Sequence, residues 1–549
     1  MLQWGGDDAF THMMVVGPTR CGKTATVLKP MIYQILKAKK AGKPVGMSVV
    51  EPKGDVAAMV REMCEAMEIP FTHVDPSRSD THVFNPMQGD TDDVAEATVA
   101  VLKSLFGKQE AFFATVQELS ARNVTKLLKE LHGDAIDLVD VVRCLRDEEE
   151  LNRKISELER LKGETDLVQF FKAELLGSLK DHFRKLVLGL RAQIENLTSN
   201  QYLKRVMQGN SDIKIADHFE KGGVLAVSTS LGLLQEAGDA FGQFVIMHLQ
   251  SGTFRRKGTE KTRVPHYLIV DEYSRYINPK TEIFLSIAAE YRVAGIFATQ
   301  SLAQLEVESG KIGPKAMKQA ILTSCRNKIA FGGLSAQDAK EFAEEFGKDL
   351  VMEKQKTYEG GLIPHLLPSS YRLTEKEKYR FYQTQLMDGL PRFHYVHKLL
   401  QQGHPQPPGL AKGNFVPRNW KEQLVNDKKF TFDFKQMRDP EKIKELWDKL
   451  RKSADHPAPE TVKEDNPQRV EQVNQVEVIS TEQPLEQQPF IPTRKRVVPP
   501  QRVIQQMKHE QQIHPPQPRV IQNHNDTRSK DTNDRELVED DGFFKNQLN

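Results

Sequence analysis

Cysteine is scarce in this sequence: its 549 residues contain only four, and no two of them form a Cys-x-x-Cys pair. This excludes a disulfide framework and a cysteine zinc site, and it suits a reducing cytosol. Long apolar runs are missing too, because no stretch reaches the roughly eighteen residues of a membrane span and no secretory signal is present. The sequence therefore predicts no transmembrane segment and a cytoplasmic protein, free or peripheral at the inner face of the cell membrane.

An excess of charge of either sign is also missing. Lys and Arg together number 77 and Asp and Glu together 75, which leaves a formal net charge of +2. A nucleic-acid partner would therefore have to bind a local basic surface. A chain of 549 residues is too long for one compact core, so two or three folded units are expected.

Proline is absent between residues 95 and 210, where leucines recur at helical spacing among charged residues, and this predicts a compact all-α insertion. On both sides, β-rich runs alternate with helical patterns, which predicts a parallel sheet with crossover helices. Gln, Pro and Asn dominate the end of the chain and predict disorder there. The expected parts are a first core segment at 1–94, the insertion at 95–215, a second core segment at 216–371, an ordered extension at 372–452 and a disordered Gln/Pro-rich tail at 453–549.

A glycine-bounded loop lies between a short apolar strand and the start of a helix, in "MMVVGPTRCGKTATVLKP". It fits G-x-x-x-x-G-K-[ST], in which backbone N–H groups and the helix start bind nucleotide phosphates. Lys23 is expected to reach the β- and γ-phosphates, and Thr24 to offer its hydroxyl to Mg²⁺. The predicted ATP-binding residues are Gly17, Pro18, Thr19, Arg20, Cys21, Gly22, Lys23 and Thr24.

Two acidic residues, Asp271 and Glu272, end the apolar run "YLIVDEY". At the carboxyl end of a parallel strand, Asp271 can hold Mg²⁺ and Glu272 can polarise the attacking water. An ordinary strand-terminal acidic pair is the alternative, but the phosphate loop favours the catalytic interpretation. A second acid at this place indicates a water-activating ATPase.

The next predicted strand ends at Gln300 in "FATQS", where an amide could contact the γ-phosphate and report its loss. Arg292, in "AEYRVAGI", lies at a predicted helix end between the acidic pair and Gln300. It could act as an arginine finger on a neighbouring subunit's ATP. The alternative is that Arg292 only compensates a helix dipole. The candidate catalytic residues are therefore Glu272, Gln300 and Arg292.

Five segments follow one another as in the conjugative coupling proteins of type IV secretion systems, and the chain resembles this TraG/TraD group within the FtsK/HerA family of DNA-pumping ATPases. They are "THMMVVGPTRCGKT", "SVVEPKGDV", "FNPM", "YLIVDEY" and "AGIFATQSLAQL", within Phe10 to Gly347. The family usually shows Asp-Pro-Lys-Gly-Glu where this chain has Glu51-Pro52-Lys53-Gly54-Asp55, with both acids exchanged. Family members also usually carry transmembrane helices before the loop, whereas sixteen residues precede Gly17 here. A separate membrane anchor, a soluble offshoot or a start further upstream would each explain this.

The resemblance implies an α/β fold with a RecA-like P-loop nucleotide-binding core and an inserted all-α subdomain that takes part in substrate recognition. It assigns Lys23 and Thr24 to ATP and Mg²⁺, and it makes Asp271 and Glu272 the hydrolytic pair and Gln300 the sensor. Arg292 matches an arginine that some members supply to a neighbouring subunit. It also implies a homo-oligomeric ring, a hexamer with DNA in its channel and each ATP between neighbouring subunits.

The main functional hypothesis is an ATP-driven DNA translocase, a coupling protein that delivers single-stranded DNA or a relaxase–DNA complex to a type IV secretion channel. Its partners would be single-stranded DNA, relaxase or relaxosome proteins, and the channel or a membrane-anchor protein. A second hypothesis is a soluble FtsK/HerA-like DNA pump for plasmid maintenance or phage packaging. A third is a nucleotide-gated adaptor for protein cargo without sustained hydrolysis.

Overall fold

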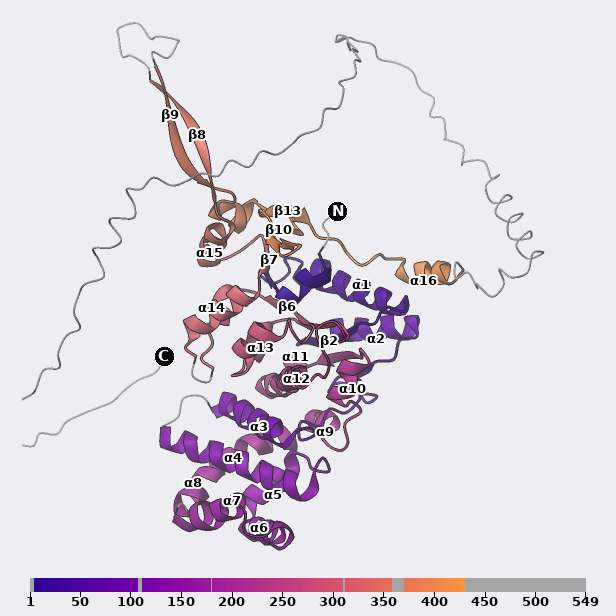
Figure 1. Ribbon diagram of the computed structural model, residues 1–549, viewed down its shortest axis with the longest axis vertical. Coiled ribbons are helices and arrows are strands. Elements are labelled where there is room, and N and C mark those ends of the chain that lie inside the picture. The colour runs from indigo at the N-terminus through magenta and orange to yellow at the C-terminus, as the bar shows by residue number, and fades with distance from the viewer. Residues whose placement is uncertain (1–3, 107–110, 179, 310–311, 358–369, 430–549) are drawn as a thin grey trace, which may run out of the picture. The chain divides into compact units, whose positions relative to one another are not determined.

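The apolar runs of the sequence pair into one large sheet in the computed structural model, which describes residues 4–106, 111–178, 180–309, 312–357 and 370–429 (Figure 1). Seven strands from β7 to β3 are parallel, and β10 and β13 extend that sheet in antiparallel pairing. The spatial order among the described residues is β13 (Gly409–Lys412), β10 (His394–Lys398), β7 (Asn327–Phe331), β1 (Met13–Val16), β6 (Val293–Thr299), β5 (His266–Val270), β2 (Gly46–Glu51), β4 (Val224–Ser228) and β3 (Thr72–Val74).

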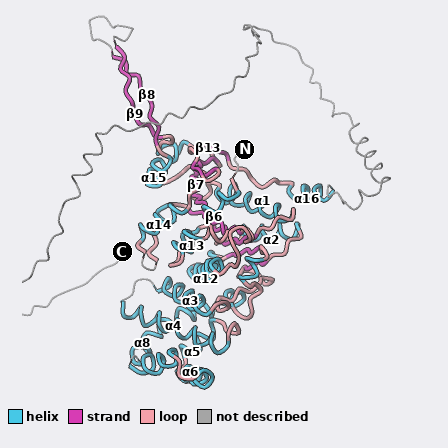
Figure 2. Tube along the Cα trace, in the orientation of Figure 1, coloured by secondary structure: helices cyan, strands magenta, loops and turns pink. Residues whose placement is uncertain are grey.

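The central strands are buried on both faces, because side chains alternate along a strand and each face is covered by helices. In β1, Met13 and Val15 belong to one apolar cluster, and Met14 and Val16 belong to another on the opposite face. All four side chains are fully buried. Figure 2 shows the strands enclosed between two helical layers.

One face is covered by an amphipathic helix that starts at the phosphate loop and by its neighbours. Their apolar side chains, such as Ile32 and Val60, share a cluster with the odd-numbered residues of β1. The helices of this layer are η2 (Thr24–Leu28), a π-helical turn that continues into α1 (Lys29–Lys40), then α2 (Asp55–Met67) and α16 (Trp420–Lys429).

The other face is covered by helices that carry most of the aromatic side chains of the core, including Phe244, Phe284 and Phe342. These share a cluster with the even-numbered residues of β1 and with alternate apolar residues of β5 and β6, such as Val270 and Phe297. The segments of this layer are α11 (Leu231–Leu234), α12 (Glu236–Phe254), η4 (Tyr273–Tyr276), α13 (Thr281–Ile287), η5 (Leu302–Leu305), α14 (Pro314–Ser324) and α15 (Ala336–Phe346).

A bundle of helices is inserted between β3 and β4, and it packs through α3 against α12 (Figure 1). The described residues of this insertion contain no strand. Its segments are α3 (Thr91–Phe106), α4 (Ala111–His132), α5 (Leu138–Arg146), α6 (Glu148–Lys162), α7 (Asp166–Gln169), η3 (Phe170–Ser178), α8 (Lys180–Ser199), α9 (Gln201–Met207) and α10 (Ile215–Glu220).

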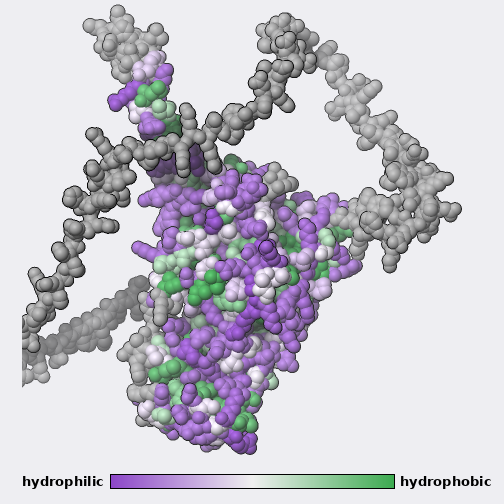
Figure 3. Space-filling view, in the orientation of Figure 1, coloured by the Kyte–Doolittle hydropathy of each residue, from purple (hydrophilic) through white to green (hydrophobic). Residues whose placement is uncertain are grey.

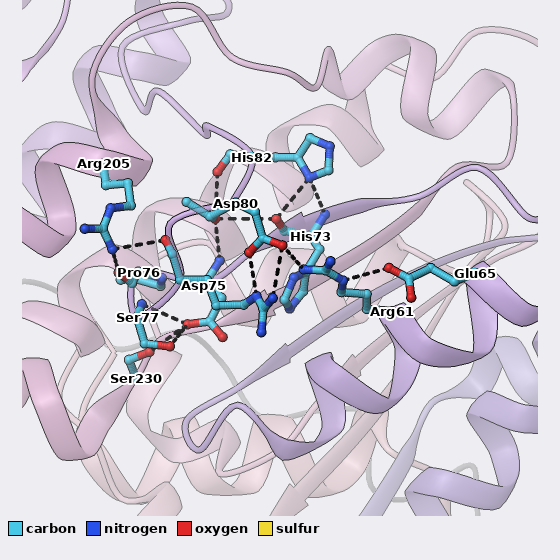
Figure 4. Close-up of polar contacts among 12 residues, drawn as sticks. Arg61, Glu65, His73, Asp75, Pro76, Ser77, Asp80, His82, Arg205 and Ser230 are labelled. Atoms are coloured by element: carbon cyan, nitrogen blue, oxygen red, sulfur yellow. Dashed lines mark hydrogen bonds and ion pairs between the residues drawn. The ribbon is translucent and has the colours of Figure 1, made fainter.

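Polar contacts tie the insertion to the loop after β3 (Figure 4). The guanidinium of Arg205, on α9, donates to the carbonyls of Pro76 and Arg78 in that loop. The loop is also held from the sheet side, where the Asp75 carboxylate accepts a hydrogen bond from the Ser230 hydroxyl at 3.2 Å. The junction between core and insertion is therefore hydrogen-bonded as well as packed.

The segments after α15 add two features to the core. An antiparallel ribbon of β8 (Lys348–Thr357) and β9 (Ser370–Tyr379) projects from it, and its Leu350 and Leu373 are more than 60% exposed. Figure 3 shows apolar residues on this ribbon amid a mainly hydrophilic surface. The remaining short elements of the described chain are η1 (Gly6–Thr11), η6 (Gln385–Gly389), β11 (Leu400–Gln401) and β12 (His404–Pro405).

The observed architecture confirms the predicted fold class of an α/β nucleotide-binding core with an all-α insertion. The domain boundaries stay predictions, and the one placed after residue 371 falls inside β9. The end of the predicted ordered extension, at 430–452, and the predicted disordered tail at 453–549 lie outside the described residues. Within the residues that are described, we find no helix with the length and apolarity needed to cross a bilayer.

Several buried histidines are held in the neutral form. His12 accepts a hydrogen bond from the Gly295 amide at Nδ1 and donates one to the Leu285 carbonyl at Nε2. The Nε2 atoms of His218 and His266 both contact the Ser48 hydroxyl, at 2.8 and 2.9 Å. Burial lowers the pKa of His12 to about 4 and that of His218 to about 3, and it lowers the pKa of His266 well below its usual value.

These lowered pKa values predict an acid-labile fold. Below pH 6.5 these histidines are protonated in the unfolded chain but stay neutral in the native protein. The free energy of unfolding therefore falls by about 1.4 kcal/mol per unit of decreasing pH for each such histidine. Burial of Glu51 raises its pKa to about 7, so the native protein binds one proton there that the unfolded chain lacks, and this partly offsets the effect of the histidines. We expect a lower urea midpoint at pH 5.5 than at pH 7.5.

A His218→Gln variant should show a shallower dependence of the urea midpoint on pH. The exposed His404 provides the matched control, because His404→Gln should leave the pH dependence unchanged. Identical pH dependence in His218→Gln and the wild type would contradict the assignment.

Candidate nucleotide-binding site

The phosphate loop follows β1 directly and depends on close packing at its first glycine. A Cβ atom on Gly17 would lie 2.7 Å from both the Cys21 Sγ and the Phe331 Cβ, so only glycine fits there. Arg20 and Gly22 have φ angles of +66° and +118°, which turn the loop back on itself before the helix begins. The loop therefore lies at the carboxyl end of the parallel sheet, where ligands bind in open α/β folds.

The lysine of the loop is held within it. Lys23 is buried, and its ammonium group donates to the Gly17 carbonyl across the loop. Burial raises the pKa of the neighbouring Cys21 thiol, which therefore stays protonated and acts as a small neutral filler. The positive charge of Lys23 is thus not cancelled by a thiolate inside the loop.

A hydroxyl and a carboxylate from distant parts of the chain meet beside the loop. The Thr24 hydroxyl donates to the Asp271 Oδ2 at 2.7 Å. Asp271 follows β5 and is only 5% exposed, and this burial raises its pKa. A hydroxyl and a carboxylate are hard oxygen donors of the kind that Mg²⁺ prefers, so the residues present fit this ion.

The second acidic residue contacts the predicted sensor. The Gln300 Nε2 donates to the Glu272 Oε1 at 3.0 Å, and the Thr19 hydroxyl donates to the Gln300 Oε1 at 3.2 Å. Glu272 has a φ of +53°, a left-handed conformation that is unfavourable for a residue with a side chain and often occurs at functional sites. The structure therefore joins the loop, the acidic pair and the predicted sensor in one chain of contacts.

A residue that the sequence interpretation missed fixes the backbone at the sensor. The Gln304 Oε1 accepts hydrogen bonds from the Gln300 and Ser301 amides at 3.2 and 3.3 Å, and from the Thr299 hydroxyl at 3.0 Å. Ser301 and Gln304 form a capping box at the start of η5. The S-x-x-Q spacing of a capping box was present in the sequence and could have revealed this role.

The segment Glu51-Pro52-Lys53-Gly54-Asp55 lies at the same edge of the sheet, where it runs from the last residue of β2 to the first residue of α2. The buried Glu51 carboxylate accepts from the Lys53 and Ala57 amides at 2.7 and 3.3 Å, which anchors the start of α2. Asp55 forms a 2.7 Å ion pair with Lys29 of α1. Of the two exchanged acids, Glu51 therefore holds the start of α2 and Asp55 joins α2 to α1 next to the loop.

Arg292 lies apart from the other predicted site residues. It immediately precedes β6, whereas Gln300 follows the last residue of that strand, so roughly 26 Å of extended chain separates them. Its guanidinium contacts the Asp7 carboxylate at 2.7 Å and stacks on the Phe10 ring at 4.1 Å. Within one chain, Arg292 therefore fixes η1 and does not reach the phosphate loop.

A parallel sheet with the loop after β1 and acidic residues after β5 defines the class of P-loop nucleotide-binding proteins with a RecA-like core. The sequence profile of a family described as Type IV secretory system Conjugative DNA transfer matches residues 3–378. This is more than half of the chain, which therefore belongs to that family. No curated protein matches the sequence.

Three solved structures share the fold at low sequence identity. The bacterial conjugative coupling protein TrwBdeltaN70, in its unbound monoclinic form, has a TM-score of 0.54 and 15% identity over 75% of this chain and 86% of that chain. The plasmid coupling protein TrwB with GDPNP, a non-hydrolysable GTP analogue, has a TM-score of 0.53 and 16% identity over 75% of this chain and 88% of that chain. TrwB with ADP and Mg²⁺ has a TM-score of 0.53 and 14% identity over 75% of this chain and 87% of that chain.

The contacts of Gln304 lead to a prediction about stability. A Gln304→Ala variant leaves two backbone amides at the sensor without their acceptor, so the free energy of unfolding in urea should fall by about 1 kcal/mol. Gln319→Ala, on the exposed side of α14, is the control and should change stability little. Equal stability of the two variants would show that the Gln304 contacts contribute nothing.

Proposed function

We propose that this chain is an ATP-driven DNA translocase that delivers single-stranded DNA or a relaxase–DNA complex to a type IV secretion channel. Membership of the conjugative DNA transfer family supports a role in DNA transfer through a type IV secretion system. The proposed hydrolysis of ATP rests on two adjacent contacts, that of Thr24 with Asp271 and that of Glu272 with Gln300. These contacts support the proposal, because the Thr24 and Asp271 oxygens could bind a metal ion and the neighbouring Glu272 carboxylate could activate water.

Each residue has a distinct role in this proposal. Lys23 and the loop amides bind the phosphates of ATP. Thr24 and Asp271 hold Mg²⁺, which when bound neutralises charge that develops on the transferring phosphate. Glu272 orients the attacking water and accepts its proton, and Gln300 holds the Glu272 carboxylate in place. Loss of the γ-phosphate would change the Gln300 contacts, and this change is the sensor signal.

The nucleotide and metal are proposed by analogy with TrwB, which was solved with ADP and Mg²⁺ and with an ATP analogue. A closed ring of identical subunits, with each ATP between neighbours, would give DNA a central channel. The arginine-finger role of Arg292 stays a prediction for such a ring. In that assembly Arg292 would have to exchange its contact with Asp7 for a neighbour's phosphate.

Two substitutions at the site separate ATP binding from hydrolysis. Glu272→Gln removes the proton acceptor, so ATP turnover should fall at least about 100-fold while ATP affinity stays near that of the wild type. Lys23→Ala removes the phosphate contact and should weaken ATP binding itself. Turnover and equilibrium binding of ATP are measured in parallel for each protein.

The partly exposed Glu282 on α13 provides a matched control for these two variants. Glu282→Gln makes the same change in charge outside the site and should keep full turnover. Wild-type turnover in Glu272→Gln would refute its catalytic role.

DNA stimulation distinguishes a translocase from a cargo adaptor. ATP hydrolysis by the full chain should increase on addition of single-stranded DNA, because DNA binding and the motor cycle are coupled. Contacts to phosphates release counterions, so the stimulation should fall as salt rises from about 50 to 200 mM. Hydrolysis that is indifferent to DNA at low salt would favour the protein-cargo adaptor instead.

A further inference from the structure

The extension after β9 reaches the phosphate loop through two close approaches. A Cβ atom on Gly22 would lie 2.7 Å from Cδ1 of Phe393, and one on Gly413 would lie 2.4 Å from Oγ1 of Thr26. Glycine at both positions lets the segment that joins β10 and β13 to the core contact the first turn of the loop helix. The Gly413 amide also donates to the Phe393 carbonyl at 2.8 Å, which fixes the extension there.

Phe393 is held in a conformation that its residue type disfavours. It is the third residue of a turn closed by the His394 amide and the Pro391 carbonyl at 3.0 Å, and its φ is +63°. Glycine or asparagine usually occupies such a position, because a side chain makes a positive φ unfavourable. Strained residues of this kind persist where the surrounding structure holds them, and they cluster at ligand sites.

The Phe393 ring belongs to an aromatic surface that is open to solvent. Phe393 is half-buried and meets Phe415 edge to face at 5.0 Å between ring centres, while Phe415 remains 54% exposed. The Arg392 guanidinium lies 4.6 Å from the Phe393 ring. An exposed aromatic pair beside a phosphate-binding loop offers a flat apolar surface next to a site for an anion.

The two ends of a bound triphosphate must leave the loop on different sides. The residues assigned to the γ-phosphate end, Asp271, Glu272 and Gln300, follow β5 and β6 on one side of β1. Phe393 precedes β10, which lies beyond β7 on the other side of β1. A nucleotide with its γ-phosphate at the acidic pair therefore directs its nucleoside towards β7 and β10.

We propose that Phe393, with Phe415 beside it, is the stacking surface for the base of the bound nucleoside triphosphate. The proposal rests on the proposed nucleotide function of the loop and adds the class of ligand. Stacking acts on the face of a base and not on its hydrogen-bonding edge. The site therefore accepts ATP and GTP with similar affinity and binds pyrimidine nucleotides more weakly.

The test compares a nucleotide with a phosphate chain that has no base. Equilibrium binding of ATP and of inorganic tripolyphosphate to the full chain is measured with Mg²⁺ present. Phe393→Ala should weaken ATP binding about ten-fold and leave tripolyphosphate binding within two-fold of the wild type. Unchanged ATP binding, or equal weakening of both ligands, would overturn the stacking role.

A second variant gives a readout even if Phe393→Ala fails to fold. Phe393→Trp keeps an aromatic face, so this variant should retain ATP binding. Its tryptophan fluorescence should exceed that of the wild type, and ATP should quench the added signal whereas tripolyphosphate should not. Absence of this difference would overturn the proposal. The control is Tyr382→Ala, which removes a partly exposed aromatic side chain of the same extension that packs on Tyr379 of β9. This variant should bind both ligands normally.

The same measurements separate failure of this inference from failure of the proposed function. If wild-type protein binds neither ATP nor tripolyphosphate, or if Lys23→Ala binds both normally, the phosphate loop itself is wrongly assigned. If both ligands bind through Lys23 but Phe393→Ala does not distinguish them, only the base site is wrong.

Discussion

The site depends on the parallel register of three adjacent strands. Val16 of β1 pairs with Thr299 of β6, and Val270 of β5 pairs with Phe297 of the same strand. Because parallel strands end at one edge of the sheet, the residues that follow them emerge together. This is why Thr24 and Asp271, 247 positions apart in the chain, are in hydrogen-bond contact. A shift of one residue in this register would move every site side chain away from the loop.

Buried acidic groups at the carboxyl edge contrast with buried neutral histidines elsewhere in the sheet. Asp271 and Glu51 both have raised pKa values because burial disfavours the charged form. Their hydrogen bonds to Thr24 and to backbone amides compensate part of that desolvation. His266 and Ser48, on β5 and β2, instead form an uncharged network inside the sheet. The buried acidic groups therefore lie at the carboxyl edge of the sheet, where a bound cation would compensate the charge of a carboxylate.

The segments before β1 and after β9 stabilise the site from outside the parallel sheet. The Asp8 carboxylate accepts from the Gln402 and Gly403 amides at 2.8 and 2.7 Å, which joins η1 to the turn between β11 and β12. Arg292 holds the same η1 segment through Asp7. The extension that carries Phe393 is thus attached both to the phosphate loop and to the start of the described chain.

The sequence alone determined the elements whose signals are local. A strand, loop and helix around Lys23 follow from apolar periodicity and a motif of fixed spacing, and the helices of the insertion follow from leucine spacing in a proline-free stretch. Only the tertiary structure decided which distant residues meet. The contacts of Thr24 with Asp271, of Glu272 with Gln300 and of Phe393 with the phosphate loop depend on strand order and on packing between segments far apart in the chain. Local periodicity carries no information about such pairings.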